Sequence, residues 1–359
     1  MTPLDYQDIA IPKCYDFDEI IDVRSPDEFL VDHIPGALNF PVLDNDQRKK
    51  VGTTYKQVNP FEAKKLGAGL IAKNIGDHVV KHFSYKSKNY KPYIYCWRGG
   101  QRSKSLATIL SAIGWRVALL RGGYKNYRSQ VLDGFKNKVK HLSFIILGGV
   151  TGVGKTKVLN ALQSMGHQVL DLEGLANHKG SLLGGLVDIK QPHQKYFESL
   201  IFQKLSSYEP TRPVWIESES HKIGDCSIPP CLWDVLKSCP VIELSAPTHE
   251  RVQFLMDEYP HYVDETDKLK NHLKTSKRFV GSGEYKEFEL AINKGEIEKA
   301  VVILLESYYD PSYKNASKKW FKIPLGTVTA SELNEKSFPV IAQSCIDLLD
   351  KNFLSPNAS

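Results

Sequence analysis

One glycine-rich stretch limits the folds open to this chain more than any other feature. Residues 149–156 read Gly-Val-Thr-Gly-Val-Gly-Lys-Thr, the pattern G-x4-G-K-T, and an apolar run at 144–147 precedes them. Apolar residues at helical spacing follow at Val158, Leu159 and Leu162. A buried strand, a glycine-rich turn and a helix in this order are typical of a P-loop in an open parallel α/β sheet.

The backbone N–H groups of such a loop can surround a diphosphate, and the lysine adds a positive charge while the threonine can hold Mg²⁺. Further strands of the same sheet are predicted at 168–172, 214–216 and 241–244, with helices between them and a helical C-terminal part. The predicted diphosphate-binding residues are Gly149, Thr151, Gly152, Val153, Gly154, Lys155 and Thr156.

Carboxylates follow two of these strands. Glu217 and Glu219 come at the end of the strand at 214–216, and Asp171 ends the strand at 168–172. Because the carboxyl ends of parallel strands meet at one edge of the sheet, these groups face the same crevice as the P-loop. They are candidates for Mg²⁺ binding or acid/base chemistry, as is His178. The alternatives, a helix cap or salt bridge for the carboxylates and a packing role for the histidine, stay open.

A second anion-binding loop is predicted around Cys96. Residues 93–95 are typical of the end of a buried strand, and the chain from Arg102 onward has the apolar spacing of a helix. Gly99 and Gly100 allow backbone amides to turn inward between them. Amides, a helix N-terminus and two arginines favour a deprotonated thiol over the alternative of a buried structural cysteine. The predicted catalytic residues are Cys96, Arg98 and Arg102.

The residues before this loop predict a small α/β domain. Residues 20–24 are typical of a short strand, and Ser25-Pro26-Asp27-Glu28 is a strong helix start. The string IDVRSPDEFLVDHIPGALNFP, followed by Cys96-x4-Arg-Ser and by LLRGGYKNYR at 119–128, resembles a rhodanese domain. The resemblance implies that Cys96 carries a sulfur or selenium atom, and that Asp22 and Arg24 support the loop structurally.

An insertion at about 44–90 is longer than a rhodanese domain needs, and it predicts two basic helices. Its string RKKVGTTYKQVNPFEAKKLGAGLIAKNI is similar to that of one family, the tRNA 2-selenouridine synthases, as is DLEGLANH at 171–178. The resemblance covers nearly the whole chain. It implies a rhodanese-like domain at 1–138 and a P-loop domain with a helical, basic C-terminal region at 139–359. A chain of 359 residues is expected to form about two domains, which agrees with this division.

The positive charge of the chain is concentrated. The segment 78–170 contains sixteen Lys and Arg residues and one acidic residue, a balance of +15, so the remainder carries −9 of the total of +6. Both predicted anion-binding loops lie in this segment, which favours a polyanionic partner over a merely solvated surface. Basic residues near aromatic ones also suit RNA. The predicted tRNA contacts are Arg48, Lys49, Lys64, Lys274, Arg278 and Lys319.

Composition predicts a cytoplasmic protein without a membrane span. No apolar run approaches the roughly 18 residues of a transmembrane helix, and the N-terminus has no secretory signal pattern. The six cysteines are too sparse for a disulfide framework. Cys226, Cys231 and Cys239 lack the paired spacing of a zinc site, so no firm metal site is predicted.

The resemblance implies a transferase that replaces sulfur by selenium in wobble 2-thiouridine of tRNA. Its co-substrates are geranyl diphosphate, expected at the P-loop, and selenophosphate, expected at Cys96. The expected sequence is S-geranylation, formation of a Cys96 perselenide, and selenation with loss of geranylthiol. A selenophosphate-producing enzyme is the expected protein partner, and Mg²⁺ the expected metal ion.

Two alternatives remain from the sequence. The P-loop equally permits ATP or GTP, so the chain could be a rhodanese-type sulfurtransferase fused to a nucleotide-using domain. The other alternative is a non-enzymatic regulator that senses phosphate or redox state. The intact Cys96 loop disfavours this alternative.

Overall fold

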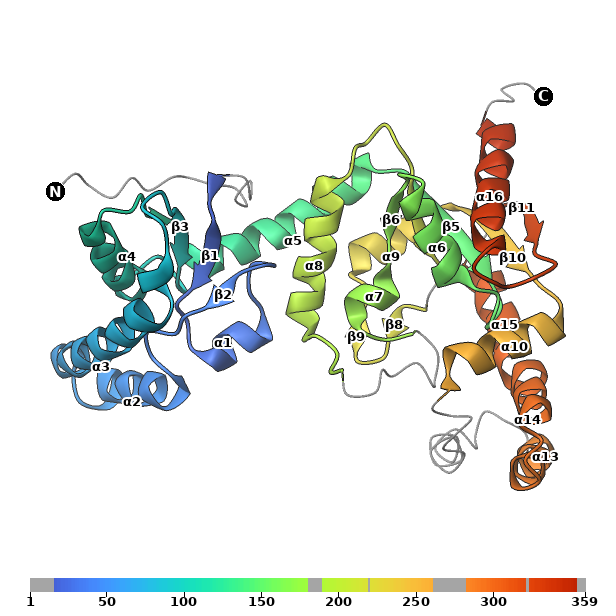
Figure 1. The fold of residues 1–359 in the computed structure, drawn as a ribbon, viewed down its shortest axis with the longest axis horizontal. Helices are drawn as coiled ribbons and strands as arrows, with labels where there is room; N and C mark the ends of the chain where they lie inside the picture. Colours follow the sequence, from blue (N-terminus) through green and yellow to red (C-terminus); the bar gives the residue numbers. More distant parts are fainter. Residues whose placement is uncertain (1–15, 180–188, 219, 261–281, 321–322, 354–359) are drawn as a thin grey trace. The chain divides into compact units, whose positions relative to one another are not determined.

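A computed structural model describes residues 16–179, 189–218, 220–260, 282–320 and 323–353. The chain forms two compact units, 1–136 with 192–203, and 137–191 with 204–359. The first boundary lies two residues before the one predicted from sequence. Each unit has its own parallel sheet (Figure 1), which confirms the predicted α/β class.

The first unit contains a four-stranded parallel sheet in the order β2-β1-β3-β4. Its strands are β1 Glu19–Asp22, β2 Leu38–Asn39, β3 Pro92–Tyr95 and β4 Ala118–Leu119. Its helices are α1 Pro26–Val31, α2 Asn45–Gln57, α3 Pro60–Lys81, the 3-10 turn η2 Phe83–Tyr85, α4 Gln101–Ile113 and most of α5 Gly123–His141.

The predicted helix starts of this unit are confirmed. Helix α1 begins at Pro26, and the Glu28 carboxylate accepts a hydrogen bond from the Ser25 N–H at 3.2 Å, as a capping box requires. The insertion forms the two predicted helices α2 and α3, and both are capped by a side-chain oxygen that precedes them.

A buried ion pair lies beneath the sheet of the first unit. Arg24 is 1% exposed, and its guanidinium binds the Asp22 carboxylate at 2.6 Å and the Asp32 carbonyl oxygen at 2.6 Å. The guanidinium also lies 4.0 Å from the centre of the Tyr124 ring. The pair therefore connects β1 to the start of α5, which supports the structural role expected for both residues.

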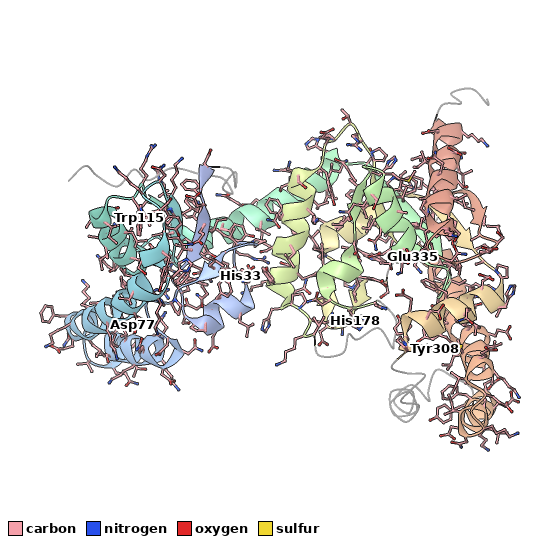
Figure 2. The ribbon with its side chains drawn as sticks, in the orientation of Figure 1. His33, Asp77, Trp115, His178, Tyr308 and Glu335 are labelled. Carbon is pink, nitrogen blue, oxygen red and sulfur yellow. The ribbon has the colours of Figure 1, made fainter. Side chains whose placement is uncertain are left out.

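Residues 192–203 return to the first unit through contacts with α1 and α5. The Ser199 hydroxyl donates to Asp32 Oδ1 at 2.8 Å, and the Tyr124 hydroxyl donates to Oδ2 at 2.6 Å. His33, labelled in Figure 2, stacks between Phe29 and Tyr196. Of these residues, Ser199 and Tyr196 lie in the first part of α8 Gln194–Ser207. No sequence motif indicated this return.

Replacing Asp32 by asparagine should change how stability depends on pH. Burial raises the pKa of Asp32 to about 6, although its hydrogen bonds and Arg128 oppose the shift. The folded state then holds the proton more tightly than the unfolded chain, so this stabilisation is complete below the unfolded pKa of 3.8 and is lost as pH rises through 6. Relative to Asp32→Asn, the wild type should lose about 3 kcal/mol between about pH 4 and pH 7.

Urea unfolding at several pH values measures this difference. The matched control is Asp77→Asn on α3, because Asp77 is exposed (Figure 2) and the substitution removes the same charge. A wild-type protein that gains stability relative to Asp32→Asn as pH rises would contradict the prediction.

The second unit contains a five-stranded parallel sheet in the order β11-β10-β5-β7-β6. Its strands are β5 Phe144–Gly149, β6 Gln168–Leu170, β7 Val214–Glu217, β10 Pro240–Ser245 and β11 Ile323–Thr329, with a short hairpin of β8 Lys222–Ile223 and β9 Cys226–Ser227. Its helices are α6 Lys155–Ser164, α7 Leu172–Ala176, α9 Pro230–Leu236, α10 Thr248–Glu258, α13 Ser282–Asn293, α14 Ile297–Leu304, the π-helical turn η3 Leu305–Tyr309, α15 Asp310–Trp320 and α16 Ser337–Phe353.

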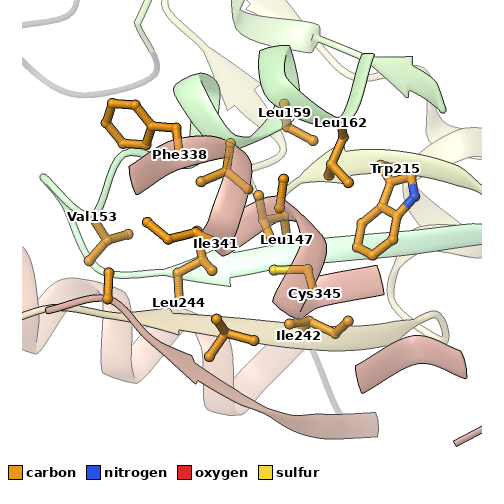
Figure 3. Packing of buried hydrophobic residues seen from close by; sticks show 14 of the residues in the cluster. Leu147, Val153, Leu159, Leu162, Trp215, Ile242, Leu244, Phe338, Ile341 and Cys345 are labelled. Carbon is orange, nitrogen blue, oxygen red and sulfur yellow. The ribbon is translucent and has the colours of Figure 1, made fainter. Parts of the chain in front are cut away.

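The core of this unit lies between the sheet and helices α6 and α16. Figure 3 shows Ile341 and Cys345 of α16 facing side chains of β5 and β10, and Phe338 belongs to the same cluster. The strand β5 is buried along its whole length, so the loop that follows it starts from a rigid support.

Two expectations for this unit were incomplete. The strand predicted to continue to Leu172 ends at Leu170, because Asp171 caps the short helix α7 instead. The C-terminal part is not wholly helical, since β11 adds an edge strand beside β10.

Candidate functional site

Cys96 follows β3 directly and is 3% exposed. Its sulfur accepts a hydrogen bond from the Gly100 N–H at 3.2 Å and one from the Ser103 hydroxyl at 3.2 Å. The same hydroxyl lies 3.2 Å from the Gly100 carbonyl oxygen, and it has one proton to share between the two. Both contacts hold the sulfur in a fixed position at the end of β3. The sequence reasoning did not single out Ser103.

The first turn of α5 fixes the shape of the Cys96 loop. Tyr124 N–H donates to the Cys96 carbonyl oxygen at 2.8 Å, and Lys125 N–H donates to the Trp97 carbonyl oxygen at 2.9 Å. Because C=O and N–H of a trans peptide point in opposite directions, the next N–H groups along the loop point away from α5. This arrangement is consistent with the prediction that backbone amides of the Cys96 loop turn inward.

Gly123 is required for this contact. Its φ is +59°, and a Cβ there would lie 2.2 Å from the Cys96 carbonyl oxygen and 2.7 Å from the Gly99 nitrogen. No side chain fits that space without moving the loop backbone. The glycine pair before α5 is therefore part of the Cys96 site, although it lies in another segment of the sequence.

The two arginines predicted beside Cys96 have different surroundings. Arg102 contacts Glu28 of α1 with both terminal nitrogens, at 2.6 Å and 3.2 Å. Burial raises the pKa of Glu28, but the hydrogen bonds and charge of Arg102 outweigh it and hold the pKa below its usual range. Arg98 is exposed. The charge of Arg102 is thus largely balanced, and Arg98 is the arginine whose side chain faces solvent.

The predicted P-loop joins β5 to α6. The Lys155 ammonium donates to the Gly149 carbonyl oxygen at 2.9 Å, across the loop. Gly154 has a φ of +76°, and a Cβ there would lie 2.7 Å from the Phe338 ring. The glycine thus allows both the turn and close packing on α16. Of the seven predicted diphosphate-binding residues, Gly149 ends β5, four lie in the loop, and Lys155 and Thr156 begin α6.

A chain of contacts connects the P-loop threonine to two carboxylates. The Thr156 hydroxyl donates to Glu173 Oε2 at 3.2 Å, and the Glu173 N–H donates to Glu217 Oε1 at 2.8 Å. Glu217 is 2% exposed at the end of β7, beside β5. The structure therefore places Glu217 near the P-loop threonine and adds Glu173, a residue of the segment DLEGLANH that was not among the predicted site residues.

Of the other predicted acid/base residues, the two that the structure describes make local contacts that do not involve Thr156 or the P-loop. Asp171 Oδ1 accepts the Gly174 N–H at 2.7 Å, which is an N-cap role. Burial lowers the pKa of His178, and its Nδ1 has no hydrogen-bond partner among the described residues. Glu219 lies outside the described residues.

Tyr313 and Glu243 also contact the P-loop. The Gly149 N–H donates to the Tyr313 hydroxyl at 2.6 Å, and this hydroxyl donates to Glu243 Oε2 at 3.0 Å. Burial raises the pKa of Glu243, although Tyr313 and Lys155 oppose the shift. No pattern in the sequence points to this pair, because Tyr313 lies 164 positions from Gly149.

Arg251 of α10 supports the P-loop from below. It is 4% exposed, and its Nε donates to the Thr151 carbonyl oxygen at 2.9 Å. Its two terminal nitrogens bind Asp310 at 2.6 Å and 3.0 Å. Because the C=O and N–H of a trans peptide point in opposite directions, the Thr151 carbonyl that faces Arg251 leaves the Gly152 N–H pointing away from the guanidinium.

Replacing Arg251 by lysine should weaken diphosphate binding about tenfold, because one ammonium cannot replace both the bidentate Asp310 contact and the Thr151 contact. Calorimetric titration with inorganic pyrophosphate measures the change. Arg212→Lys is the matched control, since this exposed arginine contacts the backbone of Gly166 in the same unit. Equal affinities for the two folded variants would refute the role of Arg251.

The predicted RNA contacts are only partly covered by the structure. Arg48 and Lys49 lie on α2, and Lys64 is exposed on α3. Lys274 and Arg278, and the side chain of Lys319, lie outside the described residues. Within the described ranges, no group of three or more His, Cys, Asp or Glu residues could hold a metal ion, and no helix is long and apolar enough to cross a membrane.

Two family models match the chain. One, described as "tRNA 2-selenouridine synthase AAA domain", matches residues 142–329 and contains the P-loop. The other, described as "Rhodanese-like domain", matches residues 7–130 and contains Cys96. These matches confirm the predicted order of a rhodanese-like domain followed by a P-loop domain.

Relatives match along both units. A tRNA 2-selenouridine synthase of Sulfurovum sp. (strain NBC37-1) is 30% identical, over 87% of this chain and 95% of the relative. The protein of that name from Hydrogenovibrio crunogenus is 32% identical, over 86% of this chain and 94% of the relative. For Pseudomonas syringae pv. syringae the identity is 34%, over 67% of this chain and 65% of the relative.

Proposed function

The chain belongs to the tRNA 2-selenouridine synthase family, and from this premise we propose that it replaces sulfur by selenium in wobble 2-thiouridine of tRNA. The observation that supports the proposal is the presence of two separate glycine-containing loops, one in which the Gly100 N–H contacts the Cys96 sulfur and one in which the Lys155 ammonium lies across the P-loop. One loop suits a chalcogen donor and the other a diphosphate, so each half-reaction has its own site.

The first half-reaction is S-geranylation at the P-loop. The thiocarbonyl sulfur attacks C1 of geranyl diphosphate, a C–S bond forms, and the C–O bond breaks with its electron pair leaving on diphosphate. The base loses its N3 proton, which keeps the product neutral. Lys155 and the loop amides stabilise the departing charge, which is the largest effect such a site can supply. Alkylation also makes the sulfur a better leaving group.

The residues beside the P-loop fit a magnesium ion. Mg²⁺ in phosphate sites is usually held by one or two carboxylates, a hydroxyl and the phosphate oxygens. Thr156 and the carboxylates of Glu173 and Glu217 provide this set of donors, joined by the contacts described above. When bound, the ion would neutralise charge on the diphosphate.

The second half-reaction is selenation at the Cys96 loop. Selenophosphate, delivered by a selenophosphate-producing enzyme, donates selenium to the Cys96 thiolate. The perselenide then attacks C2 of the base, and geranylthiolate leaves with the electron pair of its C–S bond. A small cellular thiol finally attacks the Cys96 sulfur, forming a mixed disulfide and releasing selenium on the base.

Electron balance gives the perselenide a measurable by-product. As the S–Se bond forms, the P–Se bond must break with its electron pair staying on phosphorus, so the phosphorus product is phosphite. A phosphate product instead requires selenophosphate to attack C2 directly, with water later taking the phosphoryl group and Cys96 not carrying selenium. Phosphorus NMR of the reaction mixture distinguishes the two.

The test of the function uses the purified full chain and an anticodon stem–loop RNA with 2-thiouridine. Geranyl diphosphate alone should give the S-geranylated nucleoside, and adding selenophosphate should give 2-selenouridine, both measured by mass spectrometry of nucleosides. A chain that instead hydrolyses ATP or GTP and transfers sulfur to small thiols without RNA would overturn the proposal in favour of a nucleotide-using sulfurtransferase.

A further inference from the structure

Beyond its Cys96 loop, the first unit contains another place suited to an anion. A pocket of about 450 Å³ lies between the N-terminal end of α1 and one face of α2. The N-cap residue Ser25 and Asp27 of helix α1 line one side. Helix α2 contributes residues at helical spacing, among them three basic ones, Arg48, Lys49 and Lys56.

The lining selects a polar, negatively charged ligand. The other lining residues are polar or glycine, so no apolar side chain lines the pocket. Three cations face the single carboxylate of Asp27. The volume falls within the roughly 300–1,000 Å³ of small-ligand sites, enough for a nucleotide unit.

The basic face of α2 is not needed to hold the helix in place. The opposite face packs on α3, where a Cβ added at Gly67 would lie 3.5 Å from Val51. Helix α2 has no buried residue, and Lys49 and Lys56 are exposed. Apart from the Arg48–Glu28 ion pair, contacts within the fold therefore do not account for the cations around this pocket.

A single carboxylate connects the pocket with the Cys96 loop. Glu28 Oε2 lies 3.8 Å from Arg48 Nε in the pocket wall and 2.6 Å from Arg102 Nη1 at the start of α4. The pocket wall and the helix that follows Cys96 are thus one side chain apart. A ligand that touches Arg48 is anchored beside the loop in which selenium is transferred.

We propose that this pocket binds a phosphodiester of the RNA substrate close to the nucleotide that is modified. The inference rests on the proposed function, since it takes tRNA as the substrate. The phosphate contacts the three cations, while Thr53 and Gln57 can hydrogen-bond to ribose or to a base edge. The pocket thereby positions the RNA backbone for reaction at Cys96.

The test compares two triple variants of the full chain. Arg48→Gln/Lys49→Gln/Lys56→Gln removes the pocket cations, and Lys50→Gln/Lys73→Gln/Lys81→Gln removes three exposed cations of α2 and α3 that do not line the pocket. Fluorescence anisotropy with a labelled anticodon stem–loop RNA gives affinity and its salt dependence. The pocket variant should lose about tenfold more affinity than the control, and its salt slope should fall by about 1 for each lost phosphate contact.

A further variant tests the pocket without removing a contact to Glu28. Gly52→Glu puts a carboxylate into the pocket at a helical position where glycine is unfavourable by about 1 kcal/mol, so the fold should tolerate it. The added Cβ meets only the movable end of Arg48, at 3.0 Å. RNA affinity should fall as in the triple pocket variant.

Equal losses in the two triple variants would show dependence on net charge alone and would overturn the pocket. Unchanged RNA affinity with a raised KM for selenophosphate would assign the pocket to free phosphate and overturn the RNA assignment. A wild-type chain that binds no RNA at low salt would overturn the proposed function, whereas a wild-type chain that binds RNA and a pocket variant that binds it no more weakly than the control variant would overturn the pocket alone.

Discussion

Cys96→Ser should geranylate 2-thiouridine RNA at the wild-type rate and accumulate that product without inserting selenium. Serine is close in size and can keep the contacts with Gly100 and Ser103, so the loop should stay folded. A hydroxyl, however, does not ionise near neutral pH and cannot carry selenium. Mass spectrometry of the nucleosides measures both products.

Lys155→Ala should show the opposite defect. Losing this cation from the P-loop should slow geranylation by about 10²–10³, whereas RNA that is already geranylated should be selenated normally. Lys157→Ala is a suitable control on the same helix, because Lys157 pairs with Glu258 and Glu335 instead of with the loop backbone. If Cys96→Ser abolished both steps while RNA binding survived, the assignment of two sites would be wrong.

RNA affinity should fall by about 10³ or more between about 50 and 200 mM salt, if about six phosphates are neutralised. The physical reason is release of counterions from the RNA when lysine and arginine side chains replace them. Filter binding across this salt range measures the slope, and an uncharged osmolyte at equal osmolality controls for solvent effects. A flat salt dependence would exclude phosphate contacts as the main source of affinity.

The structure reduces the charge available for this binding. The segment 78–170 has a formal balance of +15, but at least four of its cations pair with carboxylates from other segments. These cations are Lys86, Arg102, Arg128 and Lys157. A charge count along the sequence therefore overstates the field that RNA meets, because folding brings acidic residues from outside the segment.

Both loops could be predicted because the information that forms them is local. A strand, a turn with glycines and a helix follow one another within about fifteen residues in each case. The helix start at Ser25 and the P-loop turn at Gly154 likewise depend on neighbouring residues. Their positions in the structure agree with the sequence reasoning.

The residues that support the loops could not be predicted, because their partners are distant in sequence. Glu28 reaches Arg102 across 74 positions, and Ser199 reaches Asp32 across 167. The strand β11 was missed for another reason. It is a largely exposed edge strand that contains Pro324 and Gly326, so it has neither the buried run nor the alternation by which strands are recognised.

The Arg251–Asp310 pair has a consequence for ligand binding at a distance. It closes a stretch of 59 positions that contains a small hydrophobic cluster of its own, around Tyr285, Phe288 and Leu304. The same guanidinium holds the P-loop backbone at Thr151. Free-energy coupling between two sites is reciprocal, so we expect a ligand that tightens the P-loop through Arg251 to stabilise this cluster as well, and loosening of the cluster to lower ligand affinity at the P-loop. The stability of the cluster and the conformation of the P-loop thus depend on the same arginine.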